Sequence, residues 1–347
     1  MRTLVGALGI CLQVTMILTL VGLSRGVLGS MAERQRGSGA DIVIKAPDSS
    51  ALSYGLNMPE AIVDLVRGMP HVAQATGNLV HPISNLDSIT GINLAEFNRM
   101  SGGFKFIEGG PFRAQNDMVV DRIFAQQKKL HAGDTFNYGH DWHITGVVEE
   151  GKLSRTFADM QALQEIFGEN KKVSVIYVKV DDPKNTDSVI ADIEHRLEGH
   201  KVYSMAEFVS LFTASGVPLV EGFTEVVIGV SAIVGFLGVF LAMYTAVLER
   251  TREIGILKAM GASPGYIMDI LLRETLLLAF VGTVLGILAT YGTRALLAQI
   301  APNLPQMLVP DWYWKAALIS IVGALIGAIY PGMKAARQDA IEALAYD

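Results

Sequence analysis

The sequence predicts an α+β membrane protein with four transmembrane helices and a mixed α/β extracytoplasmic domain inserted between the first and the second. Half of the 347 residues are hydrophobic, 18% are charged, and the mean hydropathy is +0.36, a balance that soluble domains seldom reach. The hydrophobic excess is concentrated in four uncharged stretches, each near the roughly 20 residues that a helix needs to cross a bilayer. One long polar region separates the first stretch from the other three.

Charged residues bound each of the four uncharged stretches, as expected where a helix leaves the lipid. A buried helix of a soluble protein is the alternative. Four runs of 18 to 23 residues would overfill the core of one small domain, however, and buried core helices are usually shorter. We therefore expect the first transmembrane helix within residues 1–29. The other three are expected at about 226–248, 270–297 and 314–333.

The first stretch also has features of a secretory signal peptide. It follows Met1-Arg2, and small residues such as Gly29 and Ser30 come after it. Its 22 uncharged residues exceed the ~7–15 of a signal sequence. The length favours a membrane anchor that is not cleaved.

Basic residues gather in the loop between the second and third stretches and after the fourth, whereas residues 298–311 contain neither Lys nor Arg. Because short loops rich in Lys and Arg remain in the cytoplasm, both termini are predicted to be cytoplasmic and residues 30–221 to lie outside. The run Trp312-Tyr313-Trp314 would then lie at the outer membrane interface, where aromatic side chains are enriched. The basic residues are Arg250, Arg252, Lys258, Arg273, Lys334 and Arg337.

The region at 30–221 carries most of the polar composition, with 18 Lys and Arg against 25 Asp and Glu between Met31 and Glu221. Short segments with helical and with strand patterns alternate along this region, which predicts a mixed α/β domain. Helices are predicted at 59–67, 123–130, 154–167 and 186–197. Strands are predicted at 41–45, 118–120, 173–180 and 201–203, with a hairpin that joins 135–138 to 142–148. From Ala206 the chain is expected to turn helical again as a stalk and, after a break at 216–218, to lead into the second transmembrane helix.

Composition disfavours several classes of function. The formal net charge of −6 provides no basic excess for a nucleic-acid backbone, so no nucleic-acid partner is expected. The single cysteine, Cys11, can form neither an internal disulfide nor a Cys-based zinc site. Residues 146–152 match the first seven positions of a phosphate-binding loop, but Leu153 stands where the Mg²⁺-binding Ser or Thr is required. We therefore expect any ATP to be bound by another chain.

All seven histidines lie in the predicted outer domain, and two of them, His140 and His143, flank the predicted hairpin turn. Solvated turn residues are the favoured interpretation, and transient contact with a metal or haem is the alternative. The spacing supplies no third metal ligand. It also supplies no nucleophile, base and orienting acid, so neither a bound metal nor an enzyme active site is expected in this chain.

The cytoplasmic loop between the second and third transmembrane helices predicts a short amphipathic helix at about 250–261. Ile254 and Leu257, and less perfectly Met260, fall near one side of this helix. Gly261 and Pro264 provide a stop signal. The helix could lie on the lipid surface, or it could dock a cytoplasmic partner through its apolar ridge, with its charges setting the register.

The residues of this loop, ERTREIGILKAMGAS at 249–263, closely resemble the signature of the FtsX-like permeases. That family includes the MacB-type and lipoprotein-releasing membrane components of ABC systems. The closing segment at 330–344 also resembles the family's ending, except that Ala340 replaces the usual proline. The segments at 109–120 and 133–148 look like the MacB-like extracytoplasmic core domain. Family members usually carry a basic amphipathic helix ahead of the first span, whereas this sequence begins almost within that span.

The resemblance divides the chain into a first transmembrane helix (1–29), a MacB-like core domain with stalk (30–221) and an FtsX-like permease domain (222–347). It implies a multi-pass protein of the bacterial inner membrane that pairs with a cytoplasmic ABC ATP-binding subunit, which holds the ATP and Mg²⁺. A homodimer, or a pair with a related permease, is implied, and an outer adaptor protein is a further candidate partner.

The implied function is mechanotransmission, in which ATP hydrolysis by the separate subunit moves the outer domains. The movement would export or extract an amphiphilic substrate such as a lipoprotein, a peptide, a hydrophobic toxin or haem. A transmembrane regulator that relays ATPase activity to a cell-wall hydrolase is the alternative. The positions expected to contact the ATPase are Arg250, Arg252, Glu253, Ile254, Gly255, Leu257, Lys258 and Gly261.

Two further groups of residues are candidates for function. Glu221 and Glu225, four residues apart, share a helix face. They are expected either to line a substrate entrance that favours cationic amphiphiles or to mark a solvated helix end. Three pairs of glycines spaced four apart could support dimerisation or close packing within the chain. These pairs are Gly22 with Gly26, Gly282 with Gly286, and Gly323 with Gly327.

Overall fold

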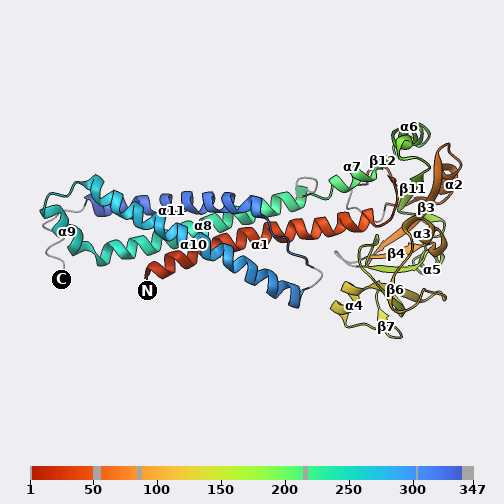
Figure 1. The fold of residues 1–347 in the computed structure, drawn as a ribbon, viewed down its shortest axis with the longest axis horizontal. Coiled ribbons are helices and arrows are strands. Elements are labelled where there is room, and N and C mark those ends of the chain that lie inside the picture. The colour runs from red at the N-terminus through yellow and green to blue at the C-terminus, as the bar shows by residue number, and fades with distance from the viewer. Residues whose placement is uncertain (1, 50–55, 84–87, 214–217, 302–303, 338–347) are drawn as a thin grey trace. The chain divides into compact units, whose positions relative to one another are not determined.

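The computed structural model describes residues 2–49, 56–83, 88–213, 218–301 and 304–337 (Figure 1). The chain forms two compact units. The membrane unit contains residues 1–26, 218–300 and 304–347, and the outer unit contains residues 27–217 and 301–303.

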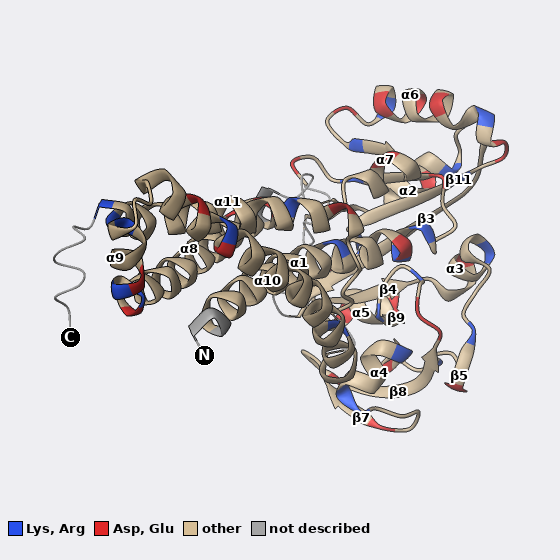
Figure 2. Ribbon diagram, turned by 60° about the vertical axis from the view of Figure 1, so that its left-hand side comes forward, with Lys and Arg blue, Asp and Glu red and all other residues tan. Residues whose placement is uncertain are grey.

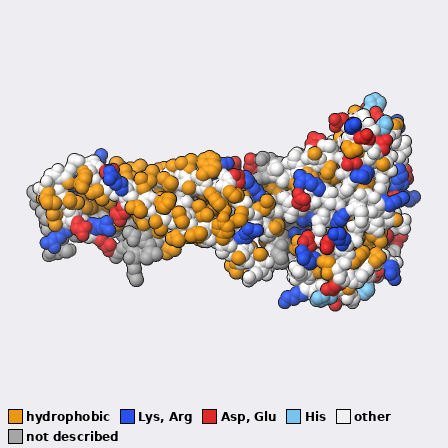
Figure 3. Space-filling view, in the orientation of Figure 1, with side chains coloured by type: hydrophobic (Ala, Val, Ile, Leu, Met, Phe, Trp, Pro, Cys, Tyr) orange, Lys and Arg blue, Asp and Glu red, His pale blue; other side chains and the backbone are white. Residues whose placement is uncertain are grey.

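The membrane unit consists of helices, and four of its helices are long and apolar enough to cross a bilayer. This finding confirms the predicted fold class. Hydrophobic side chains dominate the visible face of these helices in Figure 3. The first helix is longer than expected, because α1 continues without interruption into the outer unit. The helices are α1 (Arg2–Arg36), α8 (Pro218–Glu249), the short α9 (Thr251–Ala259), α10 (Pro264–Ile300) and α11 (Pro310–Arg337).

Close contact between α1 and α10 depends on two glycines of α10. A Cβ atom at Gly282 would lie 2.7 Å from the Cβ of Ile10, and one at Gly286 would lie 2.7 Å from the Cβ of Val14. The approach brings the Thr15 hydroxyl within 3.1 Å of the Gly286 carbonyl oxygen, to which it donates. Small residues allow membrane helices to approach in this way.

The other two glycine pairs also lie against neighbouring segments of the same chain. A Cβ at Gly22 would lie 2.4 Å from the carbonyl oxygen of Met307, and Gly26 is closer still to the carbonyl of Pro305. A Cβ at Gly327 would lie 2.9 Å from the carbonyl oxygen of Phe236 in α8. Gly22, Gly26 and Gly327 therefore pack closely within the chain, and a role of the glycine pairs in dimerisation stays a prediction.

The outer unit is built on a 10-stranded sheet with the order β12-β1-β11-β3-β4-β9-β6-β8-β5, in which β7 also pairs with β8. A separate pair joins β10 to β2. The strands are β1 (Ile42–Lys45), β2 (Met58–Pro59), β3 (Val72–Pro82), β4 (Ser88–Ile92), β5 (Phe106–Gly109), β6 (Asp117–Asp121), β7 (Thr135–Asn137), β8 (Asp141–Val148), β9 (Thr156–Asp159), β10 (Lys172–Val173), β11 (Val175–Val180) and β12 (Lys201–Ser204).

Short helices connect and cover these strands, and buried residues from four of them, α2, α4, α5 and α6, belong to the hydrophobic cluster that includes the fully buried Trp142. They are α2 (Ala61–Arg67), α3 (Leu94–Ser101), α4 (Arg122–Lys128), α5 (Met160–Ile166), the 3₁₀ helix η1 (Pro183–Asn185), α6 (Thr186–Arg196) and α7 (Met205–Ser210). The break expected at 216–218 falls largely outside the described residues.

The helix predicted at 154–167 is wrong in its first half. Residues 156–159 form β9, which lies between β4 and β6 inside the sheet. Asp159 ends the strand, and its side chain accepts hydrogen bonds from the N–H groups of Gln161 and Ala162, which begins α5. Pairing with two neighbouring strands overrides the local helical pattern.

Asp121 ends β6 and is 1% exposed. Its Oδ1 caps α4 by accepting the N–H of Phe124 at 2.7 Å, whereas its Oδ2 has no hydrogen-bond partner among the described residues. Burial raises the pKa of Asp121 to about 6, despite the opposing attraction of Arg155 and of Arg34 in α1. The folded outer unit therefore disfavours the charged form of this carboxyl group.

The first prediction concerns the α1–α10 contact. Gly286→Val should destabilise the membrane unit, because the added side chain overlaps Val14, and overpacking typically costs about 1–3 kcal/mol. Gly292→Val is the matched control in the same helix, since no heavy atom lies within 4 Å of the Cβ position there. The thermal unfolding midpoint of the protein in detergent should fall for Gly286→Val only. Equal effects of the two variants would contradict the assigned contact.

The second prediction concerns pH. Because the folded-state pKa of Asp121 lies above its ordinary value, the buried charge lowers stability at neutral pH, and this cost disappears as the pH falls toward 4. Asp121→Asn keeps the cap and removes the charge, so it should stabilise the outer unit at pH 7.5 by on the order of 1–3 kcal/mol. Hydrogen exchange of the α4 amides measures this gain.

The gain should shrink as the pH is lowered from 7.5 to 4. Asp182→Asn is the control, because Asp182 is an exposed capping residue of η1. A pH-independent effect of Asp121→Asn would show that the buried charge is not its cause.

Candidate functional site

Helix α9 lies where α8 ends and α10 begins, at one end of the membrane unit (Figure 1). Arg250 alone separates α9 from α8. At the other end, the N–H of Gly261 donates to Lys258 and that of Ala262 donates to Leu257, at 2.9 and 3.0 Å. Gly261 has a φ of +95°, so these two bonds form the Schellman arrangement that ends helices at glycine. The predicted stop at Gly261 is confirmed.

One face of α9 is buried in the membrane unit. Thr251, Ile254 and Gly255 are buried, and Ile254, at 7% exposure, belongs to the same hydrophobic cluster as Ile267 and Leu271 of α10. Burial of Ile254 and Gly255 favours a packing role within their own chain, and contact of the eight predicted positions with the ATPase stays a prediction. Ile254 anchors α9 in the hydrophobic cluster of the membrane unit.

The opposite face of α9 is exposed. Ile256 and Met260 are 44% and 71% exposed, and Arg252 and Glu253 are also exposed. Neither Arg252 nor Glu253 forms an ion pair with another described residue. Acidic and basic residues are visible around this end of the unit in Figure 2. The exposed face therefore combines two apolar side chains with two charges of opposite sign.

The remaining predicted contact residues have intermediate or structural positions. Arg250 donates to Glu274 of α10 at 3.1 Å, which ties the α8–α9 junction to α10. Leu257 and Lys258 are half-buried. Gly261 ends the helix, and open space surrounds its Cβ position.

Sequence reasoning missed Ile256 and underrated Met260 as members of the exposed face. Both are apolar and lie four residues apart, the spacing that places two side chains on one helical face. That spacing was the available signal. It was obscured because Ile254 and Leu257 form an equally regular apolar pair on the other side.

The remaining candidates lie apart from α9 in the chain. Glu221 and Glu225 are exposed in the first turns of α8. His140 lies 3.1 Å from the Oδ1 of Asn116, and His143 lies 3.3 Å from the Oδ1 of Asp117. The described part of the chain contains no group of three or more His, Cys, Asp or Glu residues arranged to hold a metal.

The segment that partly matches a phosphate-binding loop has a different architecture. Its first three residues, at 146–148, end strand β8. The next element after residue 152 is strand β9, not the helix whose N-terminus would receive phosphate. Lys152 donates instead to the backbone carbonyl of Ser101.

Two family profiles together match most of the chain. The MacB-like periplasmic core domain matches residues 3–196, and the FtsX-like permease C-terminal domain matches residues 225–340.

Several relatives extend this similarity. The chain is 26% identical to an uncharacterized ABC transporter permease, YknZ, of Bacillus subtilis (strain 168), over all of this chain and 96% of YknZ. It is 26% identical to the macrolide export ATP-binding/permease protein MacB of Hahella chejuensis, over 99% of this chain but only 58% of that MacB. The crystal structure of the YknZ extracellular domain matches 48% of this chain and all of that domain, with 16% identity and a TM-score of 0.37.

The MacB-like profile covers nearly all of α1 and most of the outer unit, and the FtsX-like profile covers most of α8 and all of α9, α10 and α11. An ABC permease works with an ATP-binding subunit, and the helices identify a multi-pass membrane protein. The chain belongs to the family of ABC transporter permeases of the MacB/FtsX type.

Proposed function

We propose that this permease couples ATP hydrolysis by a separate cytoplasmic subunit to movement of its outer unit, and thereby exports or extracts an amphiphilic substrate. The main support for the proposal is that one side of α9 is buried and the other is exposed. Ile254 anchors the helix inside the membrane unit, while Ile256 and Met260 remain exposed on its other side. Exposed apolar side chains next to charges suit a protein partner, since the apolar groups supply affinity and the charges supply register.

The connections of α9 suit the transfer of force. One residue joins it to α8, and the bond from Arg250 to Glu274 ties that junction to α10. Four residues, at 260–263, join it to α10, and the Schellman bonds stiffen them. A push on α9 would therefore move α8 and α10, because no long flexible loop separates them.

Helix α1 offers a continuous route to the outer unit. Its first part belongs to the membrane unit, and its last ten residues, from Val27, belong to the outer unit. There, Gln35 accepts a hydrogen bond from the Tyr177 hydroxyl at 2.8 Å, and the Arg34 carbonyl accepts one from the N–H of Leu153 at 2.7 Å. Rotation or tilt of α1 would therefore act directly on the sheet.

In the proposed assembly both termini and α9 face the cytoplasm, and two copies of this chain, or this chain and a related permease, meet two ATP-binding subunits. Those subunits hold the ATP and Mg²⁺. The substrate is a lipoprotein, a peptide, a hydrophobic toxin or haem, and an outer adaptor protein would complete an export route. Glu221 and Glu225, at the outer end of α8, would face the substrate entrance.

The third prediction tests the α9 interface. The double variant Ile256→Glu, Met260→Glu should remove the apolar contact and reduce co-purification of the ATP-binding subunit at least about tenfold, the effect of losing roughly 1.4 kcal/mol of binding. The measurement uses tagged full-length protein from native membranes, with the co-purified ATPase quantified by mass spectrometry. Ile107→Glu is the matched control, because Ile107 is a similarly exposed isoleucine, 49% accessible, in the outer unit.

Undiminished co-purification of the ATPase with the double variant would contradict docking through α9. Substrate screening in nanodiscs addresses the rest of the proposal. Stimulation of ATP hydrolysis by a lipopeptide, a peptide or haem would support transport. Hydrolysis that depends on α9 but responds only to a cell-wall hydrolase would favour the regulatory alternative.

A further inference from the structure

Two neighbouring parallel strands in the sheet of the outer unit are each followed by a helix, and the two helices leave the sheet in different directions. Strands β4 and β9 are parallel, with Ile92 paired to Asp159 at their carboxyl ends. Helix α3 follows β4 directly, and α5 follows β9 directly. Each helix begins at a side chain that caps it, Asn93 for α3 and Asp159 for α5.

The two helices cover opposite faces of the sheet. Phe157 and Ala158 are adjacent in β9, so their side chains point to opposite faces. Phe97 of α3 contacts Phe157, with 6.0 Å between ring centroids, whereas Leu163 of α5 belongs to the same hydrophobic cluster as Ala158. Divergence of this kind opens a crevice beyond the carboxyl ends of the strands, where open α/β sheets bind their ligands.

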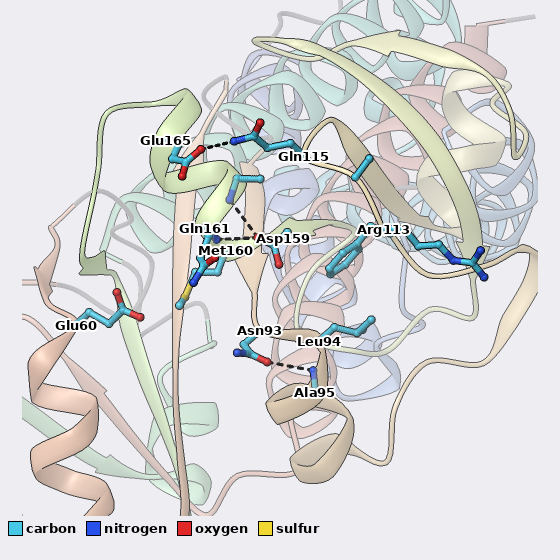
Figure 4. Close-up of a pocket in the computed structure, with 13 residues that line it drawn as sticks. Glu60, Asn93, Leu94, Ala95, Arg113, Gln115, Asp159, Met160, Gln161 and Glu165 are labelled. Carbon is cyan, nitrogen blue, oxygen red and sulfur yellow. Dashed lines mark hydrogen bonds between the residues drawn. The ribbon is translucent and has the colours of Figure 1, made fainter.

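A cleft of about 480 Å³ occupies this position (Figure 4). Leu94, Phe112 and Met160 give it an apolar part. Its charged residues are three acids, Glu60, Asp159 and Glu165, and one base, Arg113. Figure 4 shows the guanidinium group of Arg113 directed away from Asp159.

The carboxylates of the cleft are held by uncharged groups. Glu165 accepts a hydrogen bond from the side-chain amide of Gln115, and Glu60 accepts one at 3.3 Å from that of Gln164. Asp159 accepts two backbone N–H groups through Oδ1. None of the three acids forms an ion pair with another described residue. Their negative charges are therefore oriented but not neutralised by a neighbouring cation.

The same contacts disfavour an anionic ligand. The N–H groups at the start of α5 are used by Asp159, and those of Ala95 and Glu96 at the start of α3 donate to Asn93 at 3.1 and 3.2 Å. Neither helix start therefore offers these donors to a phosphate or carboxylate. A metal ion is also disfavoured, because the described residues bring no three metal-binding side chains together.

We propose that this cleft binds the amine or guanidinium group of a basic peptide, with an adjacent hydrophobic side chain seated on Leu94, Phe112 and Met160. Asp159, Glu60 and Glu165 would supply charge-assisted hydrogen bonds to the cation, which are about twice as strong as neutral ones. The peptide is either a free ligand or an exposed segment of a partner protein. The inference stands on the cleft alone and does not depend on docking through α9.

The fourth prediction tests this site with the full-length protein in nanodiscs and two fluorescein-labelled probes, the peptides Leu-Lys-Phe-Lys and Leu-Glu-Phe-Glu. The lysine peptide should bind saturably and the glutamate peptide should not. Asp159→Asn, which keeps the helix cap, and Glu60→Gln should each weaken binding of the lysine peptide about tenfold, the loss of one hydrogen bond to a charged group. Fluorescence anisotropy measures both affinities.

The control variants are Asp192→Asn and Glu194→Gln, which remove exposed carboxylates from α6. They should leave binding of the lysine peptide unchanged. Equal binding of both peptides would contradict the proposed site. Equal loss of binding in the control variants would show that the general acidity of the outer unit, and not the cleft, attracts the lysine peptide, and would also contradict the site. Unchanged affinity in Asp159→Asn and Glu60→Gln would overturn it as well.

A photocrosslinking residue at Leu94 distinguishes the two sources of the peptide in cells. A crosslink to a small peptide identifies a free ligand, and a crosslink to a larger envelope protein identifies a segment of a partner. In either case the crosslink should weaken when Asp159→Asn is combined with Glu60→Gln. A crosslink yield that is unchanged by this pair of substitutions would contradict recognition by the carboxylates.

Discussion

The membrane unit depends on close contact between helices that can gain little from burying apolar side chains, because lipid is as apolar as they are. Its stability must then come from van der Waals packing and from a few hydrogen bonds between helices. Gly282 and Gly286 allow the backbones of α1 and α10 to meet, and the pair Thr283 and Ser320 joins α10 to α11 at 2.9 Å. The rest of the molecule is attached to helices held in this way.

Close packing in the membrane unit also leaves α9 with one buried face and one exposed face. Ile254 is buried in the hydrophobic cluster of the membrane unit, so this side of α9 packs against its own chain. The opposite side of a nine-residue helix then has nothing of its own chain to cover it among the described residues. An anchored helix with an uncovered apolar and charged face is suited to receive a load from a partner and to pass that load to the helices on either side.

The outer unit is stabilised differently, because water surrounds it and the hydrophobic effect therefore favours burial of its apolar side chains. A large mixed sheet supplies the core, in which β4 pairs in parallel with β9 and β6 in parallel with β8. The cleft with unneutralised carboxylates lies beyond the carboxyl ends of β4 and β9. The buried Asp121 shows that the outer unit also retains a carboxyl group where burial disfavours its charged form.

The four membrane helices, the polar insertion between the first two and the short helix near 250–261 could all be predicted from the sequence. Lipid tolerates few charged side chains, so each membrane helix is recognisable as a local run of uncharged residues bounded by charged ones. Many short helices and strands of the outer unit were likewise visible as local patterns, as at Ile42–Lys45 and Thr186–Arg196.

Only the tertiary structure decided which partners these segments meet. Residues 156–159 form a strand because β4 and β6 lie on either side of it, and both neighbours are distant in the chain. Ile254 and Ile256 are the same amino acid two positions apart, yet the membrane unit buries the first and leaves the second exposed. The cleft also joins Glu60, which precedes α2, to residues of α3 and α5 and of the loop at 112–115. Such contacts depend on how distant segments pack, which no local pattern records.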